Sequence, residues 1–580
     1  MSGAEPSEAQ RRVFAISLVI SLATEARSYS DLALRPRVLA RAADVLWDAD
    51  NITARVLFRR AWEAAEKGDS EEVTINTKDK PPAMVISLRR MSGHDLRSEV
   101  VSMAARRDRA LGEEFLAKLK SEDERGTGDS KSTRSIGDNW STSDATSKRL
   151  QVAGKLLHDG QTERALEFAA PALDQVNPKS IGFLSELRPK DPVGADRIFA
   201  SLLARTELDP AADANTISGL SSYAFTPGLY VCFWADGQTT WSQPDEPMTP
   251  PNLPAPLLNR FFEVAGSILL RPLPPPDQDF SSSGRTGKYK VVKRLLPLFD
   301  QYSSNTSVAL RAQLTALAGD SSKDANNNES SLLTQGIKPE GNAGDVLEKM
   351  QDRLDHSKTS RERDEICAAA AVTLATQGDV RAREVADKID DSDRRAQVRQ
   401  YVDFEFVQRA IRKKEAAETT RLAKTGQLSH TQRAWAYTQA ARLLMNSQRQ
   451  RSLDLLEEAA DEARRIDGNA ADRTVMLIGV ATEFLTADRI RAWEMMGEVV
   501  KAANSAETFT GENAEIFFPM NTNSGFKLTH IGGQGFSFSG VLRSLTQDDF
   551  YRSIDLAKSF KNEAPRATAT LAIASAVLEK

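Results

Sequence analysis

Small and apolar residues recur every three or four positions in the stretch ARAADVLWDADNITARVLFRRAWEAAEKGD, residues 40–69. This spacing places Ala42 and Val45 on one face of a helix, with charged residues on the opposite face. Asp50 comes after that helix and is suited to cap a second one, and Gly68 is suited to end it. The stretch therefore predicts two helices joined by a short turn.

The second of these helices carries a continuous apolar stripe. Its members are Ala54, Leu57, Phe58, Ala61, Trp62 and Ala65. Two helices of about 16 residues are each about 24 Å long, and so short a turn makes them pack antiparallel. One such pair cannot bury all of its apolar surface, so it needs a second pair stacked on it.

Comparable helical pairs succeed one another towards the C-terminus. Four arginines in similar places, Arg361, Arg395, Arg433 and Arg473, are separated by about 34 to 40 residues. Repeats of that length are typical of stacked helical pairs. The chain is therefore predicted to be all-α, an α-α superhelix of stacked antiparallel helical hairpins with small β-hairpin insertions.

Six positions near the N-terminus match a known repeat motif in order and spacing. They are Val38, Ala42, Val45, Ala54, Phe58 and Ala61. The chain resembles a divergent tetratricopeptide-like helical solenoid, similar to bacterial proteins of that kind. The motif's tryptophan, first-helix glycine and closing proline are missing here. The resemblance covers about two-thirds of the chain and implies a protein that binds other proteins.

Two polar segments divide the chain, because they contain too few apolar residues to offset the entropy of ordering. We predict N-terminal helical hairpins at 1–120, a disordered linker at 121–148, a middle helical block at 149–318, a flexible linker at 319–345 and C-terminal helical repeats at 346–580.

Two insertions interrupt the helical period, one near 229–256 and one near 508–540. In the first, aromatic and β-branched residues flank Asp236-Gly237, the preferred composition of a tight hairpin turn. The second also has the composition of a β-hairpin, with a glycine-rich end. An insertion in a solenoid can supply binding specificity or can cover an exposed edge of the core, and both interpretations stay open.

No reaction motif is present. The five histidines are isolated in the sequence and form no metal-ligand pattern, and Cys232 and Cys367 are predicted to be packing residues. The glycine-rich pieces at 284–290 and 532–535 lack the spacing of a phosphate loop or a dinucleotide fingerprint. We therefore predict no catalytic residue, no cofactor and no metal site.

A basic cluster lies near residue 290. Its members are Arg285, Lys288, Lys290, Lys293 and Arg294. These cations could hold RNA or another anionic partner. The alternative, which we prefer, is a solvated helix face in a chain whose net charge is −5.

The run Val13–Ala23 has the length of a signal-peptide core, but four acidic residues lie near it. We favour a first repeat helix and a cytoplasmic protein, with export as the alternative if this run is a signal peptide. No segment has the roughly 20 apolar residues that a membrane span needs.

These patterns favour a protein–protein interaction scaffold or adaptor with an unknown protein partner. The alternative is an enzyme with a pocket between distant helices or under the β insertions, for example one that brings Cys232 and His530 together. A weaker alternative is anion or RNA binding through the basic cluster. Oligomeric state stays open.

Overall fold

The computed structural model describes residues 7–69, 96–126, 144–242, 248–272, 275, 278–279, 281–318, 333, 336–337, 343–467, 471–506, 508–512, 516–522, 525–531 and 536–579. The chain divides into two compact units. Unit 1 joins residues 1–100 to residues 341–580, and unit 2 comprises residues 101–340. Helix α5 (Leu96–Arg107) crosses the boundary between them.

Most helices of unit 1 form two rows. After α16 (Ala343–Asp355), row A consists of α17 (Ser360–Gln377), α19 (Ser392–Arg412), α21 (His430–Leu444), α23 (Ala471–Ala487), α25 (Phe538–Asp548) and α27 (Glu563–Leu578). Row B consists of α18 (Ala382–Ala386), α20 (Ala416–Thr425), α22 (Arg449–Arg464), α24 (Arg489–Ser505) and α26 (Phe550–Lys558). Each row A helix contacts the next row A helix and its own row B partner.

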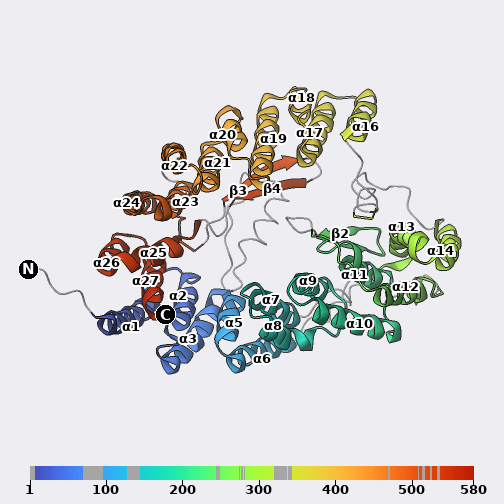
Figure 1. Cartoon of the computed structure of the whole chain (residues 1–580). Coiled ribbons are helices and arrows are strands. Elements are labelled where there is room, and N and C mark those ends of the chain that lie inside the picture. The colour runs from blue at the N-terminus through green and yellow to red at the C-terminus, as the bar shows by residue number, and fades with distance from the viewer. Residues whose placement is uncertain are drawn as a thin grey trace, which may run out of the picture. The chain divides into compact units, whose positions relative to one another are not determined.

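The two ends of the chain share one helical pair. Helix α1 (Glu8–Glu25) packs beside α27, in the place that a row B helix takes beside the earlier row A helices (Figure 1). Helix α2 (Leu34–Leu46) then continues row A against α27, with α3 (Asn51–Asp69) as its partner and the short η1 (Ala26–Ser28) before it. The N-terminal hairpin therefore extends the C-terminal series.

A carboxylate reinforces this join. The side chain of Glu512 is 6% exposed and pairs with two arginines of α2, at 3.3 Å to Arg37 Nη1 and 2.9 Å to Arg41 Nη1. Arg37 also donates two hydrogen bonds of 2.8 Å to the Glu99 carboxylate. Charge-assisted, bidentate bonds of this kind fix geometry better than single surface contacts.

The predicted N-terminal hairpin is confirmed by α2 and α3. Asp50 caps α3, because its Oδ1 accepts from the backbone N–H of Thr53 at 3.0 Å. The prediction for Gly68 was wrong, since α3 continues to Asp69. A Cβ at Gly68 would lie 2.6 Å from Leu96 Cδ1 and 3.1 Å from Leu32 O. Gly68 therefore allows a close approach rather than ending the helix.

Unit 2 also stacks helices, with one small sheet. Its elements are α6 (Arg109–Gly126), α7 (Asp144–His158), α8 (Thr162–Ala169), η2 (Ala170–Ala172), α9 (Pro178–Leu187), α10 (Pro192–Leu208), α11 (Ala214–Phe225), β1 (Tyr230–Phe233), β2 (Thr239–Ser242), α12 (Ala255–Leu269), α13 (Gly284–Tyr302) and α14 (Ser304–Leu317). Strands β1 and β2 pair antiparallel, and Gly237 in their turn has a φ of 86°. The predicted hairpin turn is confirmed.

Polar side chains of α11 pair with the backbone of β1. Ser218 Oγ donates to Val231 O at 2.6 Å, and Ser222 Oγ donates to Leu229 O at 2.7 Å. The Asn215 amide accepts from the N–H and donates to the O of Phe233. Polar residues on successive turns of α11 therefore bond to every second residue along this segment. This explains why α11 contains serines and no charge.

Two glycines of α13 accommodate β1 and the residues just after it. A Cβ at Gly287 would lie 2.1 Å from Phe233 O, and one at Gly284 would lie 2.7 Å from Ala235 Cβ. Gly284 also has a φ of 54°. Both glycines of GRTGKYK therefore permit close packing.

The predicted linker at 121–148 was too long at both ends, because α6 reaches Gly126 and α7 begins at Asp144. Residues 127–143 lie outside the described residues, as does most of the predicted linker at 319–345. Helix α16 begins inside that second segment, at Ala343.

The second predicted insertion also forms a hairpin. Strand β3 (Ile516–Thr522) pairs antiparallel with β4 (Gly525–Ile531). The predicted fold class is confirmed: the described residues form stacked helical pairs with two small β-hairpins. Among the described residues, no helix combines the length and the hydropathy that crossing a membrane requires.

Candidate functional site

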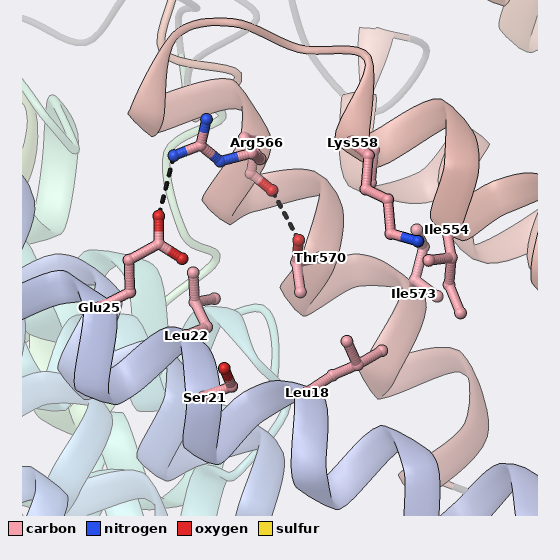
Figure 2. Close-up of a pocket in the computed structure, with 10 residues that line it drawn as sticks. Leu18, Ser21, Leu22, Glu25, Ile554, Lys558, Arg566, Thr570 and Ile573 are labelled. Atoms are coloured by element: carbon pink, nitrogen blue, oxygen red, sulfur yellow. Dashed lines mark hydrogen bonds and ion pairs between the residues drawn. The ribbon is translucent and has the colours of Figure 1, made fainter.

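A pocket of about 160 Å³ lies where the two ends of the chain meet (Figure 2). Helices α1, α26 and α27 form its walls. The lining residues are Leu18, Ser21, Leu22, Glu25, Ile554, Ala557, Lys558, Arg566, Thr570 and Ile573.

Helical spacing explains why these side chains converge. On α1, the four lining residues occupy positions i, i+3, i+4 and i+7 of the helix and so share one face. The walls are apolar where the helices meet: Leu22 is 4% exposed, Ala557 is 3% exposed and Ile573 is 1% exposed. The pocket therefore combines a buried aliphatic floor with a polar rim.

An ion pair forms one end of that rim. Arg566 Nη2 lies 2.9 Å from Glu25 Oε1, and Thr570 Oγ1 donates to Arg566 O at 2.9 Å (Figure 2). Tyr29 is buried close to this pair. Its burial, together with the negative charge of Glu25, raises the pKa of Tyr29 to about 12, so the phenol stays protonated.

Lys558 lies on the opposite side of the rim from the ion pair (Figure 2). Its side chain is 71% exposed, and its Nζ lies 3.5 Å from Asp555 Oδ1. Exposed pairs of this kind contribute little. The ammonium can therefore exchange this contact for one with an acidic group on a bound molecule.

Five large apolar side chains are exposed on α1, α24 and α26. Val13, Phe14 and Ile20 on α1, Ile490 on α24 and Tyr551 on α26 are between 42% and 73% exposed. We call these five residues the row B surface.

One contact joins α1 to α26, and another joins α24 to the last residue of α25. Phe14 meets Phe550 edge to face, with ring centroids 5.9 Å apart, and Arg489 Nε donates to Asp548 Oδ2 at 2.6 Å. A contiguous exposed apolar patch is a common mark of an interaction surface.

The second insertion covers part of row A. Strand β3 contacts α17 and α19, and Figure 1 shows the hairpin beside them. Phe518 meets Phe404 of α19 edge to face at 5.5 Å, and Phe404 meets Trp435 of α21 at 5.4 Å. Phe536 lies against Gly479 of α23. Of the two interpretations left open by the sequence, these contacts favour a cover over the core.

The basic cluster is not one exposed face, so the preferred solvated-face interpretation was wrong for two members. Lys288 is 7% exposed and donates to Arg271 O at 2.9 Å. Burial lowers the pKa of Lys288 to about 8 and that of Arg294, which is 2% exposed, to about 10.

The other three cations of the cluster are less buried. Lys290 donates to Gly237 O at 2.8 Å. Lys293 is exposed over the Tyr289 ring, 5.7 Å from its centroid, and Arg285 is partly exposed. The structure therefore does not bring the five cations together on one surface.

The thiols that an enzyme could use are both buried. Burial raises the pKa of the Cys232 thiol to about 12, and it also raises the pKa of the Cys367 thiol. Both thiols are therefore protonated at neutral pH. The side chain of His530 lies outside the described residues. Within the part of the chain that is described, no His, Cys, Asp or Glu cluster suits a metal ion.

Sequence reasoning did not find the pocket. Its walls come from segments 541 positions apart at the Glu25–Arg566 pair. The only available sign was that Leu18 and Leu22 lie one turn apart in a run that also resembles a signal-peptide core.

The stacked pairs define the chain as a helical-repeat protein. No protein-family model matches it, and no curated protein matches it. It is similar to a solved structure described as a circular tandem repeat protein with novel repeat topology and enhanced subunit contact surfaces. The two are 14% identical over 97% of this chain and 96% of that chain, with a TM-score of 0.12. A TM-score of that size carries no argument about fold or partners.

Proposed function

We propose that this chain is a protein–protein interaction scaffold, a tetratricopeptide-like adaptor of the bacterial kind. The observation that carries the proposal is the row B surface. In the described part of unit 1, the large apolar residues that are exposed lie on α24, α26, α1 and α3, except for Val380. Stacked repeats offer extended surfaces, and an apolar patch on one favours binding of another protein.

The covered part of row A also supports this choice of surface. A partner that approached α17 and α19 on the side of β3 would have to displace the chain's own strand and the Phe404–Phe518 contact. The row B surface needs no such displacement. We therefore propose that the partner binds at α24, α26 and α1.

The other sequence hypotheses have less support. Anion binding through α13 would require Lys288 and Arg294 to leave buried positions. An enzyme site that uses Cys232 would need a thiolate, whereas burial keeps this thiol protonated. A cytoplasmic location remains a proposal, which two buried, unpaired cysteines support.

A capture experiment tests the scaffold proposal. The purified full chain is immobilised, and bound proteins are quantified for wild type, for the double variant Ile490→Ser/Tyr551→Ser, and for the control Val380→Ser. Val380 is 73% exposed, like Ile490, but lies outside the row B surface. We expect a saturable partner that the control retains and the double variant loses. Equal capture by all three proteins, or no saturable partner, would contradict the proposal.

Self-association is measured on the same proteins by light scattering. If wild type is a dimer and the double variant is a monomer, a second copy occupies this surface, which would also overturn the adaptor proposal.

A further inference from the structure

The pocket between α1, α26 and α27 is a complete site only when the two ends of the chain are joined. We propose that it binds one aliphatic side chain of an acidic partner segment, with the acid placed against Lys558. This inference rests on the proposed function and names the chemistry by which the partner is anchored.

The volume of the pocket suits a single side chain better than a metabolite. Small-molecule and cofactor sites usually occupy about 300 to 1,000 Å³, whereas this pocket has about 160 Å³. An engineered apolar cavity of about 150 Å³ holds one benzene molecule. A leucine, isoleucine or phenylalanine side chain is of that size, and the buried floor of Leu22, Ala557 and Ile573 is complementary to it.

The cation on the pocket rim favours an acidic residue next to the aliphatic residue of the bound segment. Glu25 already neutralises Arg566. Lys558 is the more exposed cation of the rim, and its contact with Asp555 is long. A carboxylate on the bound segment would therefore gain most beside Lys558. A basic segment would be repelled there, and a neutral one would gain nothing from this contact.

The exposed face of α1 offers further contacts to an extended partner segment, beyond those of the one side chain in the pocket. Val13, Ser17, Ile20 and Thr24 lie one turn apart, are exposed and carry no charge. They span about 17 Å at the helical rise of 1.5 Å per residue. A segment anchored in the pocket can continue along this face without leaving a charge unpaired.

Binding must also strengthen the join between the chain ends. The pocket has walls on α1 and on α26 and α27, so a ligand binds the joined state better than an opened one. By linkage, the ligand shifts the equilibrium towards the joined state. Hydrogen exchange of α1 amides should therefore slow when the pocket is filled.

The test uses two small peptides, N-acetyl-leucyl-glutamate amide and N-acetyl-leucyl-glutamine amide. Methyl resonances of Ile554 and Ile573 in the full chain report on the pocket directly. We expect both peptides to shift these resonances at millimolar concentration. The glutamate peptide should bind about two- to fivefold more tightly, as expected for one exposed charge contact.

Variants test whether the methyl shifts come from peptide bound in the pocket. Ser21→Phe fills the pocket mouth from an exposed position on α1 and should abolish both responses. Lys558→Glu should remove the preference for the glutamate peptide, while Lys561→Glu, at an exposed position outside the pocket lining, should keep it. Retained binding in Ser21→Phe, or no methyl shift in wild type, would overturn the proposal. Because no cellular partner is used, this result is independent of the capture experiment.

Discussion

Glu25 and Arg566 are separated by 541 positions in the sequence, yet their side chains form an ion pair of 2.9 Å. Glu25 ends α1 and Arg566 lies in the first turn of α27, so the pair marks the place where N-terminal and C-terminal segments complete one helical pair. In a repeat array each pair is stabilised by its neighbours. Here α1 is a stabilising neighbour of α27.

Apolar contacts, and not the ion pair, should hold this join. Both partners of the pair are partly exposed, so Arg566→Ala should lower the free energy of unfolding by less than about 1 kcal/mol. Leu22→Ala removes a side chain that is 4% exposed and should cost about 2–5 kcal/mol. Hydrogen exchange of α1 and α27 measures both effects locally. A larger effect for Arg566→Ala than for Leu22→Ala would contradict this account.

Replacing glycine with alanine should change stability in opposite directions at two positions on neighbouring helices. A Cβ at Gly479 of α23 would lie 1.7 Å from Phe536 Cε1, whereas one at Gly497 of α24 meets nothing within 4 Å. Gly479→Ala should therefore destabilise by about 1–3 kcal/mol through overpacking. Gly497→Ala should stabilise by about 0.5–1 kcal/mol, because alanine favours a helix. Thermal unfolding of the two variants measures this, and equal shifts would contradict the contact with Phe536.

Periodicity was sufficient to predict the helical pairs, because burial of one face imposes a three-to-four spacing on each helix. It predicted α2 and α3 and the cap at Asp50. Composition predicted the turn at Gly237, since a positive φ there favours glycine. These features are local, so the residues that cause them lie close together in the sequence.

The features that the sequence did not reveal depend on distant contacts. Gly68 was predicted to end a helix because glycine often does so, but its small size serves a contact with Leu96. The burial of Lys288 and Arg294 depends on the elements that cover α13, and a charge pattern does not record this. The pocket was missed for the same reason, since Leu22 and Ile573 belong to opposite ends of the chain.

The serines of α11 should stabilise the packing of the first hairpin against this helix. Ser218→Ala leaves the buried carbonyl of Val231 without its 2.6 Å hydrogen bond. An unsatisfied buried acceptor costs about 1–3 kcal/mol. Thr315→Ala in α14 serves as the control, because its hydroxyl is exposed and bonds only within its own helix. Denaturant unfolding should show a clear loss for Ser218→Ala and little change for the control; equal losses would refute the role assigned to Ser218.

The buried amine of Lys288 should make stability depend on pH. Burial lowers the pKa of Lys288 to about 8 in the folded chain, against 10.5 for a free lysine. Between these values the unfolded chain binds more protons than the folded one, so the free energy of unfolding should rise with pH, by at most about 1.4 kcal/mol per pH unit. Measurements should stop near pH 9, because burial raises the pKa of the Cys232 thiol from 9.0 to about 12, and its ionisation on unfolding opposes this trend above that pH.

Lys288→Met keeps the length of the side chain and removes the titrating group. It should lower the slope of stability against pH between pH 8 and 9 relative to wild type, measured by denaturant unfolding at several pH values. Lys293→Met, at an exposed position on the same helix, should preserve the rise. If both variants retain the wild-type slope, another group causes it.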